Sequence, residues 1–502
     1  MTGHALSSDG DIKLGVMKLH EIHEVPGLSG APAGSLSELL RVALPLILSS
    51  GVQSLMHIID RIYLTWYSGD AIAAALPAGM VYWTILSLPY ATASYVNTFV
   101  AQYDGAGRPD RVTASLAQGV WFSLIVGSIL LTVAPWAEPL FQWMGHAPQV
   151  AQLEAIYFRW LVIGSPVALL QATLSTFFSG RGQTRVVLLV STLGVSINAV
   201  LDYCLIFGWG PFPRLGIAGA ALTDVLGNLL AAIMYTGLIA TLPEARAYLK
   251  LPCFRWEGRL LADLLRFGGP SGMQGFIDTS AFALFMMMLG WLGPESLKAS
   301  NIAFNLNTLT FIPIIGLGQA VSTIVGQRIG EGRAVRAVRS VHWGCVLGGS
   351  YMALFAILYL GVPDWLLWMY EVKATDPDFP RTREKVKGLL RYVATYSFFD
   401  ALSIVYGSAI RGAGDTRFAM VTALLGAWLV MVLPVYVMHR AGILTLDWCW
   451  MWCTLYAVLL GIIFWRRFQS GVWQTKQVIR QDVVMSTISA ETTAVCQASS
   501  QL

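Results

Sequence analysis

Long apolar stretches separated by short polar breaks run from about residue 36 to residue 466. An α-helix needs about 20 mostly apolar residues to cross the hydrocarbon core of a bilayer, so each stretch of this length predicts one membrane-spanning helix. Twelve such spans can be drawn, near residues 40–66, 76–102, 114–136, 151–178, 187–208, 216–241, 264–291, 300–326, 338–362, 389–410, 418–438 and 443–465. The pattern therefore predicts an all-α polytopic membrane protein with twelve transmembrane helices.

The composition agrees with this pattern and excludes most soluble classes of protein. Asp, Glu, Lys and Arg make up 12% of the 502 residues, whereas soluble proteins carry about 25%. The 48 glycines are typical of closely packed membrane helices. The basic residues lie mainly in loops, so the net charge of +4 does not indicate nucleic-acid binding. The six cysteines are scattered, and we expect no disulfide framework, structural metal or cofactor.

Lys and Arg gather in alternate loops, which orients the chain in the bilayer. The loops around residues 103–113, 179–186, 243–266, 327–340 and 411–417 hold 15 of them, whereas the opposite loops hold nine, six of which lie in the acid-containing loop over 363–391. Basic loops face the cytoplasm, so both termini should be cytoplasmic. We expect cytoplasmic tails over residues 1–38 and 467–502 and a cytoplasmic linker over 243–262. The loop over 363–391 should lie outside, and the protein should reside in a bacterial cytoplasmic membrane.

Two segments of the first half recur in the second half. Val100–Arg108 reads VAQYDGAGR and aligns with VGQRIGEGR at Val325–Arg333, and Gly180–Arg185 aligns with Gly412–Arg417. Because each half holds an even number of spans, both halves enter the membrane from the same side. We therefore expect two six-helix lobes, related by a pseudo-two-fold axis along the membrane normal and separated by a substrate cleft. Their predicted bounds are residues 39–242 and 263–466.

Several motifs follow one another in a fixed order along the chain. They are the stretch from Pro45 to Asp60, the two Gln-x-x-Gly-x-Gly-Arg loops, Asn198 to Asp202 followed by Gly216–Ala221, and Asp400 through Thr416. Their order and spacing resemble those of the multidrug and toxic compound extrusion (MATE) transporters over about residues 36 to 466. The resemblance implies an alternating-access antiporter that exports organic, often cationic, molecules against an inward flow of H+ or Na+.

Five aspartates lie inside the predicted spans, where an ionised carboxylate costs at least about 2.5–3.5 kcal/mol. Asp60, Asp202 and Asp224 lie at a common depth, about 9–12 Å below the outer boundary, and could form one site. Asn198 shares a helix face with Asp202. The MATE resemblance implies ion-coupling roles for Asp60, Asn198 and Asp202. Its register brings Thr223 or Asp224 to a further position of that site, although the Thr223 hydroxyl could instead bond to its own helix.

The other two acids, Asp278 and Asp400, belong to the second lobe. Tyr396 precedes Asp400 by four residues and shares its helix face. In some sodium-coupled relatives similar positions contribute to the cation site, which implies an ion-coupling or substrate role for all three here. The alternative is a structural role with internal hydrogen bonds. The first-lobe cluster is favoured because it gathers three acids and an amide, but the residues leave H+ and Na+ coupling open.

Three further residues of the first span bear on the site. Pro45 is the expected hinge, because a proline inside a helix removes a backbone hydrogen bond and lowers the cost of bending. His57 lies one turn before Asp60 and is either a proton relay or a packing residue. Arg61 points about 100° away from Asp60 and should reach the outer headgroups.

Two alternative functions, a flippase and an enzyme, would leave different residue patterns in the sequence. A flippase for lipids or lipid-linked sugars would need a basic cleft, whereas acids dominate the span interiors. An integral-membrane enzyme would need His, Cys or Ser clusters at the span ends, and the Gly180 and Gly412 loops are better interpreted as turns. We therefore expect no enzyme, but a monomer whose partners are a small organic substrate, H+ or Na+ and the lipid bilayer.

The topology can be tested by chemical labelling. A single cysteine placed at Asp376, in a chain without its native cysteines, should react with a membrane-impermeant thiol reagent from outside intact cells. The reason is that the predicted outer loops carry few basic residues without acids nearby, and such loops stay outside. A cysteine at Arg185 serves as the control and should react only after permeabilisation. The reverse pattern would contradict the predicted orientation.

Overall fold

The computed structural model describes residues 32–246, 248, 255–371 and 379–479, and these residues fold almost entirely into helices. The predicted tails over 1–38 and 467–502 and the predicted linker over 243–262 lie partly outside the described residues. The first half contains α1 (Leu36–Tyr67), α2 (Gly69–Ser94), α3 (Val96–Gly105), α4 (Pro109–Leu130), η1 (Leu131–Trp136), α5 (Ala137–Trp143), α6 (Pro148–Ile163), α7 (Ser165–Gly180), α8 (Thr184–Phe207), α9 (Ile217–Thr241) and α10 (Pro243–Arg246). The second half contains α11 (Gly258–Gly290), α12 (Pro294–Gly330), α13 (Ala334–Gly361), α14 (Pro363–Glu371), α15 (Phe379–Ala413), α16 (Thr416–Leu425), η3 (Gly426–Val432), α17 (Leu433–Arg440), α18 (Leu446–Gln469) and η4 (Val472–Thr475).

The prediction of twelve spans is confirmed. Eleven helices or continuous helix runs in the described residues are long and apolar enough to cross a membrane. The twelfth span is the pair α6 and α7, which bends by 45° at Gly164. A methyl group on Gly164 would overlap Val225 of α9, so the bend sits where only glycine fits.

Several helices are longer than the apolar pattern predicted. α15 begins at Phe379, ten residues before its predicted start, and α14 occupies much of the predicted loop over 363–391, so the description of that segment as a loop is wrong. Asp364 of α14 pairs with Arg383 and Lys387 of α15, each at 2.8 Å, so charged residues rather than apolar ones join the two helices here. These two cations hold the pKa of the exposed Asp364 carboxyl below its usual range. Hydropathy alone could not detect a helix that continues beyond the apolar stretch.

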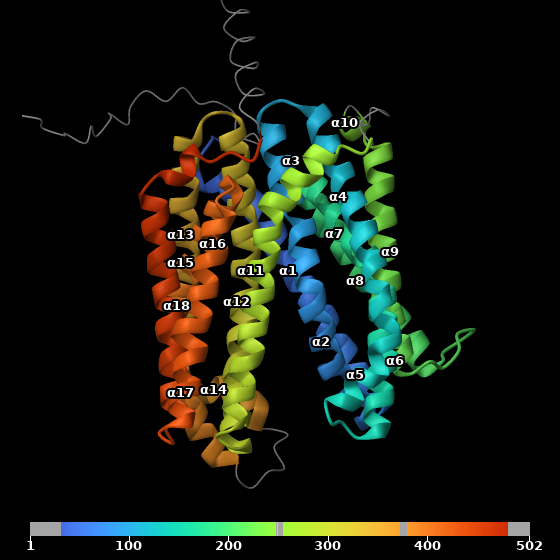
Figure 1. The fold of residues 1–502 in the computed structure, drawn as a ribbon, viewed down its shortest axis with the longest axis vertical. Coiled ribbons are helices and arrows are strands. Elements are labelled where there is room, and N and C mark those ends of the chain that lie inside the picture. Colours follow the sequence, from blue (N-terminus) through green and yellow to red (C-terminus); the bar gives the residue numbers. More distant parts are fainter. Residues whose placement is uncertain (1–31, 247, 249–254, 372–378, 480–502) are drawn as a thin grey trace, which may run out of the picture.

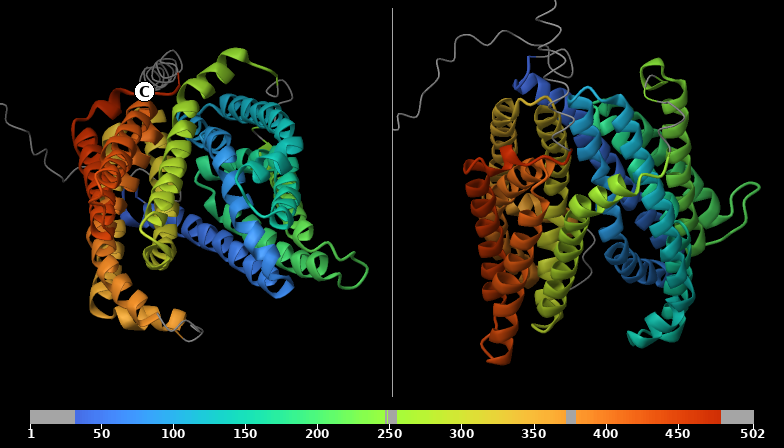
Figure 2. Two further views of the ribbon diagram at one scale, coloured as in Figure 1. Left: turned by 60° about the horizontal axis from the view of Figure 1, so that its bottom comes forward. Right: turned by 45° about the horizontal axis from the view of Figure 1, so that its top comes forward.

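The helices form two bundles, as predicted from the internal repeat. Figure 1 shows α1 to α9 beside α11 to α18; the bundles meet at one end and lean apart towards the other. We call the end where α1 begins and where α9 and α18 finish the tail side, and the opposite end the far side. Figure 2 shows the same arrangement from two further directions.

The lobes meet on the tail side through the two copies of the repeated motif. Gly105 packs against the backbone of Gln327, and Gly330 packs against the backbone of Gln102. A methyl group on either glycine would overlap the opposing glutamine carbonyl oxygen. The two turns therefore approach each other reciprocally, as the pseudo-two-fold relation requires.

Three side-chain hydrogen bonds cross the same junction. The Gln102 side-chain amide donates to the Gly412 carbonyl at 3.0 Å, and the corresponding Gln327 amide donates to the Gly180 carbonyl at 2.9 Å. Tyr95 Oη donates to the Arg411 carbonyl at 2.9 Å. Both repeated motifs thus contribute backbone and side-chain contacts to the closed tail side.

A buried ion pair fixes the start of α1 to the second lobe. Glu38 of α1 pairs with Arg328 of α12, and both side chains are almost fully buried. Arg328 also bonds Glu331 at 2.7 Å, while the Gly34 N–H donates to Glu38 Oε2 at 2.6 Å. Removing one partner of a buried pair leaves the other charge uncompensated, which is costly.

We expect Glu38→Gln to destabilise the protein by about 3 kcal/mol, because it leaves Arg328 with only the outer of its two carboxylates. The measurement is thermal unfolding of the purified protein in detergent. Glu331→Gln is the matched control: Glu331 is more exposed and should cost about 1 kcal/mol or less. Equal losses for the two variants would contradict a dominant role of the inner pair.

Candidate functional site

The predicted first-lobe residues come together where α1, α8 and α9 pack in the half of the lobe nearer the far side. Asp60 comes from α1, Asn198 and Asp202 from α8, and Thr223 from α9, and all four are buried. Gly227 of α9 leaves room for the Asn198 amide, which would lie 3.5 Å from a methyl group there. The structure therefore brings these residues into one cluster, as predicted.

Only some of the carboxylate oxygens in this cluster have a hydrogen-bond partner. The Thr223 hydroxyl lies between Asp202 Oδ1 and the Ala220 carbonyl of its own helix and contacts both. Asp60 and Asp202 are close enough that one carboxyl group could hydrogen-bond to the other if they shared a proton. The ring nitrogen Nδ1 of His57 lies 3.9 Å from Asp60 Oδ2.

Five buried polar atoms of the cluster have no hydrogen-bond partner within the described part of the chain. They are Asp60 Oδ1, both side-chain polar atoms of Asn198, Asp202 Oδ2 and Asp224 Oδ1. Unsatisfied buried polar atoms are uncommon and costly, so they mark a place where a proton, a cation or water binds. Carboxylate and amide oxygens are ligands suited to a hard cation. The residues present therefore fit either H+ or Na+.

Asp224 lies beside this cluster rather than at its centre. It is within electrostatic range of His57, Asp60 and Asp202. Among the residues that the structure describes, no three His, Cys, Asp or Glu side chains are arranged as a metal site. The three acids that the sequence placed at a common depth therefore lie within electrostatic range of one another, and their shared role in one site stays a prediction.

Sequence reasoning missed one residue at this cluster. Tyr157 of α6 lies within electrostatic range of Asp60, Asp202 and Asp224. It is a single tyrosine in an apolar span, so nothing in its local pattern distinguishes it from a packing residue.

The second-lobe acids form a separate group with a different environment. Asp278 of α11 and Asp400 of α15 lie within electrostatic range of each other. Tyr456 of α18, which the sequence did not single out, lies near both of them. Tyr396 is buried among the apolar residues around Trp450, and its predicted proximity to Asp400 is present. The two lobes therefore each hold an acid group, and the groups do not merge.

Arg411 changes the charge of the second-lobe group. The sequence placed it in a loop, but it belongs to the last turn of α15, and its guanidinium turns inward. It donates to Ser408 Oγ at 3.0 Å and to Gln274 Oε1 at 3.4 Å, and it is a neighbour of Asp278. Gln274 is four residues before Asp278 on α11, a spacing that could have indicated it. The second-lobe acids thus have a fixed cation nearby.

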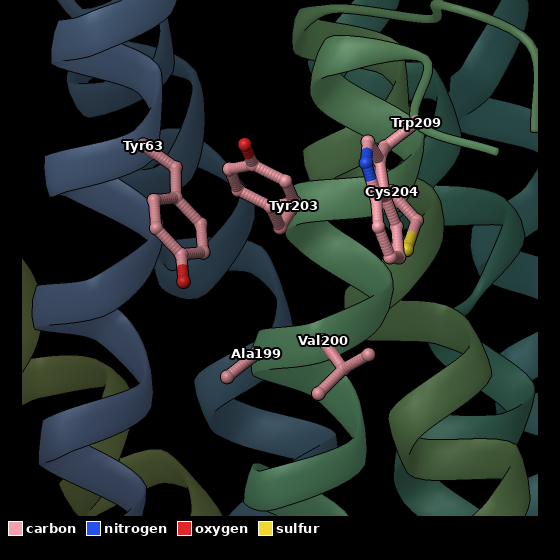
Figure 3. Close-up of a pocket in the computed structure, with 6 residues that line it drawn as sticks. All are labelled: Tyr63, Ala199, Val200, Tyr203, Cys204 and Trp209. Atoms are coloured by element: carbon pink, nitrogen blue, oxygen red, sulfur yellow. The ribbon is translucent and has the colours of Figure 1, made fainter.

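An aromatic pocket of about 270 Å³ lies one turn or less from the first-lobe acids. Its lining, shown in Figure 3, comprises Tyr63, Ala199, Val200, Tyr203, Cys204 and Trp209. Tyr63 and Tyr203 meet edge to face with ring centroids 5.9 Å apart. Aromatic faces attract organic cations, but the first-lobe acids do not line this pocket.

Comparison with known proteins gives consistent relatives. The MatE family model matches residues 45–204 and 270–437, one segment in each lobe. A probable multidrug resistance protein NorM of Thermotoga maritima is 24% identical over 448 residues, which cover 89% of this chain and 95% of the relative. The multidrug resistance protein PmpM of Pseudomonas aeruginosa is 27% identical over 400 residues, which cover 78% of this chain and 82% of the relative.

Solved structures share the fold. A MOP superfamily transporter from Pyrococcus furiosus superposes with a TM-score of 0.79 at 19% identity, covering 88% of this chain and 97% of that one. The outward-facing conformation of a multidrug resistance MATE family transporter superposes with a TM-score of 0.79 at 18% identity and the same coverage. With matching segments in both lobes, this chain belongs to the MATE family of transporters.

Proposed function

We propose that this transporter is a cation-coupled multidrug antiporter that exports small organic cations across a bacterial cytoplasmic membrane. The observation that carries the proposal is the set of unpartnered buried polar atoms around Asp60 and Asp202. Buried carboxylates whose oxygens lack partners are stabilised in a membrane by binding a proton or a metal cation. The names of the NorM and PmpM relatives support multidrug substrates.

Alternating access fits the way the lobes pack. The interlobe hydrogen bonds and ion pair of the described residues gather on the tail side, which the basic loops assign to the cytoplasm. We therefore infer that this conformation is closed to the cytoplasm and open to the outside. The similarity to an outward-facing MATE structure supports this assignment.

Competition for the same acids would couple the two fluxes. In the outward-facing state an ion from outside binds at Asp60 and Asp202 and neutralises them. An organic cation held near these carboxylates then loses its electrostatic attraction and leaves. Because each ligand weakens the binding of the other, the inward ion gradient drives export of the drug.

The remaining first-lobe residues support this exchange. Thr223 orients the Asp202 carboxylate by hydrogen bonding to it, and Asn198 adds two polar atoms that could bind the ion. Asp224 adds negative charge. Pro45 lies inside the continuous helix α1, fifteen residues before Asp60, and acts as the hinge through which ion binding changes the direction of the helix. The aromatic pocket beside Tyr63 and Tyr203 offers a surface for flat cationic substrates.

The second-lobe group contributes less to coupling under this proposal. Arg411 already supplies positive charge near Asp278, which reduces the need for an external cation. Asp278, Asp400 and Tyr396 then tune substrate binding or the transition between states. The ion remains H+ or Na+, since both suit the first-lobe oxygens.

We expect Asp60→Asn and Asp202→Asn each to reduce gradient-driven efflux by more than about tenfold, because each removes a charge that the coupling ion must neutralise. Asp278→Asn and Asp400→Asn should reduce it less. The double variant of Asp60 and Asp202 should be no worse than the worse single one, since the two acids act as a unit. The measurement is efflux of cationic dyes from proteoliposomes under separate proton and sodium gradients, which also identifies the ion.

Asp70→Asn provides the matched control, because Asp70 is an exposed aspartate in the first turn of α2. It should leave efflux unchanged. Full activity of Asp60→Asn, with complete loss only in the Asp278 and Asp400 variants, would move the coupling site to the second lobe. Efflux of anionic dyes but not of cationic dyes by the unmodified protein would contradict the proposed substrate class.

A further inference from the structure

The chain does not leave the protein after the last membrane helix. Beyond α18 it turns back and packs on the tail side, where Trp473 is fully buried and Val478 and Ile479 are only 5% and 3% exposed. The Trp473 indole stacks on Phe468 at 4.8 Å and donates to the Phe468 carbonyl at 2.9 Å. These three residues belong to the largest apolar core, together with residues of both lobes such as Val100 and Val325.

Gln102 connects this segment to both lobes. Its amide nitrogen donates to Gly412 of the second lobe, and its Oε1 accepts from the N–H groups of Val478 at 3.0 Å and Ile479 at 3.4 Å. Val478 also covers Gly414, where a methyl group would lie 2.8 Å from its side chain. A single buried side chain of the first lobe therefore holds the second lobe and the segment that follows it.

The pseudo-symmetric counterpart of Gln102 has different contacts in the part of the chain that the structure describes. Gln327 donates to Gly180 as Gln102 does to Gly412, but its Oε1 has no hydrogen-bond partner among the described residues. After α9, the described Arg255 carbonyl accepts from Gln118 of α4. Within residues 32–246, 248, 255–371 and 379–479, Gln102 therefore bonds a segment beyond the last helix of a lobe, and Gln327 does not.

We propose that residues 472–479 form a C-terminal latch that holds the tail side closed. Opening the tail side separates Gln102 from the second lobe, to which the latch is covalently joined through α18. The latch would then lose its two hydrogen bonds to Gln102, and Val478 and Ile479 would lose the first-lobe part of their apolar surroundings. Contacts made in only one of two states shift the equilibrium towards that state. The latch thus biases the transporter towards the conformation that is open on the far side.

This inference rests on the alternating-access part of the proposed function and not on its ion or substrate. The test measures the two conformations directly in the full-length protein. Spin labels at Trp143 of α5 and Trp365 of α14, in a chain with its native cysteines replaced by alanine, report the separation of the lobes on the far side. Both positions are well exposed, at 84% and 69%, and Figure 1 shows both helices at the far end.

Val478→Asp should release the latch, because it places a charge in a buried apolar contact. We expect the ratio of tail-side-open to far-side-open molecules to rise about tenfold, the effect of losing two ordinary hydrogen bonds. Thr475→Asp is the matched control, since it adds the same charge at an exposed position of the same segment. It should leave the distance distribution unchanged. Identical distributions for the unmodified protein and Val478→Asp would overturn the latch.

A second pair of variants tests the proposal if Val478→Asp fails to fold. Gln102→Met and Gln327→Met each remove the interlobe hydrogen bonds of one side-chain amide. Only Gln102→Met also removes the latch contacts. We expect Gln102→Met to shift the ratio several-fold more than Gln327→Met. Equal shifts would overturn the proposal. If Asp60→Asn loses drug efflux while these distances stay the same, the result concerns the proposed antiporter and not the latch. Failure of the latch can therefore be told from failure of the proposed function.

Discussion

The closure of the tail side depends on two glycines that allow the lobes to touch through their backbones. Gly105 and Gly330 each face the carbonyl of the opposite glutamine, and no larger residue fits at either position. This close approach brings Gln102 and Gln327 into reach of Gly412 and Gly180 and places Glu38 beside Arg328. From this junction the two bundles lean apart towards the far side (Figure 1).

The two acid groups differ mainly in what neutralises them. In the second lobe Arg411 lies near Asp278 and bonds the neighbouring Gln274 and Ser408. In the first lobe Arg61 and His57 lie near Asp60, but several polar atoms of its cluster have no hydrogen-bond partner in the described residues. A carboxylate whose neighbours supply its hydrogen bonds keeps the same environment throughout a transport cycle. A carboxylate with unpartnered oxygens changes its environment whenever an external ion binds or leaves, which is the property that coupling requires.

Much of this arrangement could be predicted from the sequence because membranes impose simple rules. The apolar stretches gave twelve spans, and the repeated glycine motifs gave two parallel halves. Helical spacing placed Asn198 beside Asp202 and Tyr396 beside Asp400. What could not be predicted depends on contacts between distant segments. The inward turn of Arg411, the approach of Tyr157 and Tyr456 to the acids, and the extension of α15 beyond its apolar part all require the positions of neighbouring helices.

The buried pair of Glu38 and Arg328 also bears on how the molecule is assembled. Glu38 lies in the first turn of the first helix, and its partner lies in the eighth span, which the ribosome makes almost 300 residues later. Until that span is inserted, the start of α1 has no cation with which to bury its carboxylate, so it must stay at the aqueous surface. The first lobe can therefore enter the bilayer early but reaches its final position only after the second lobe has begun to form. The start of α1 thus reaches its final position only after the middle of the chain has been made, long after this first helix itself was synthesised.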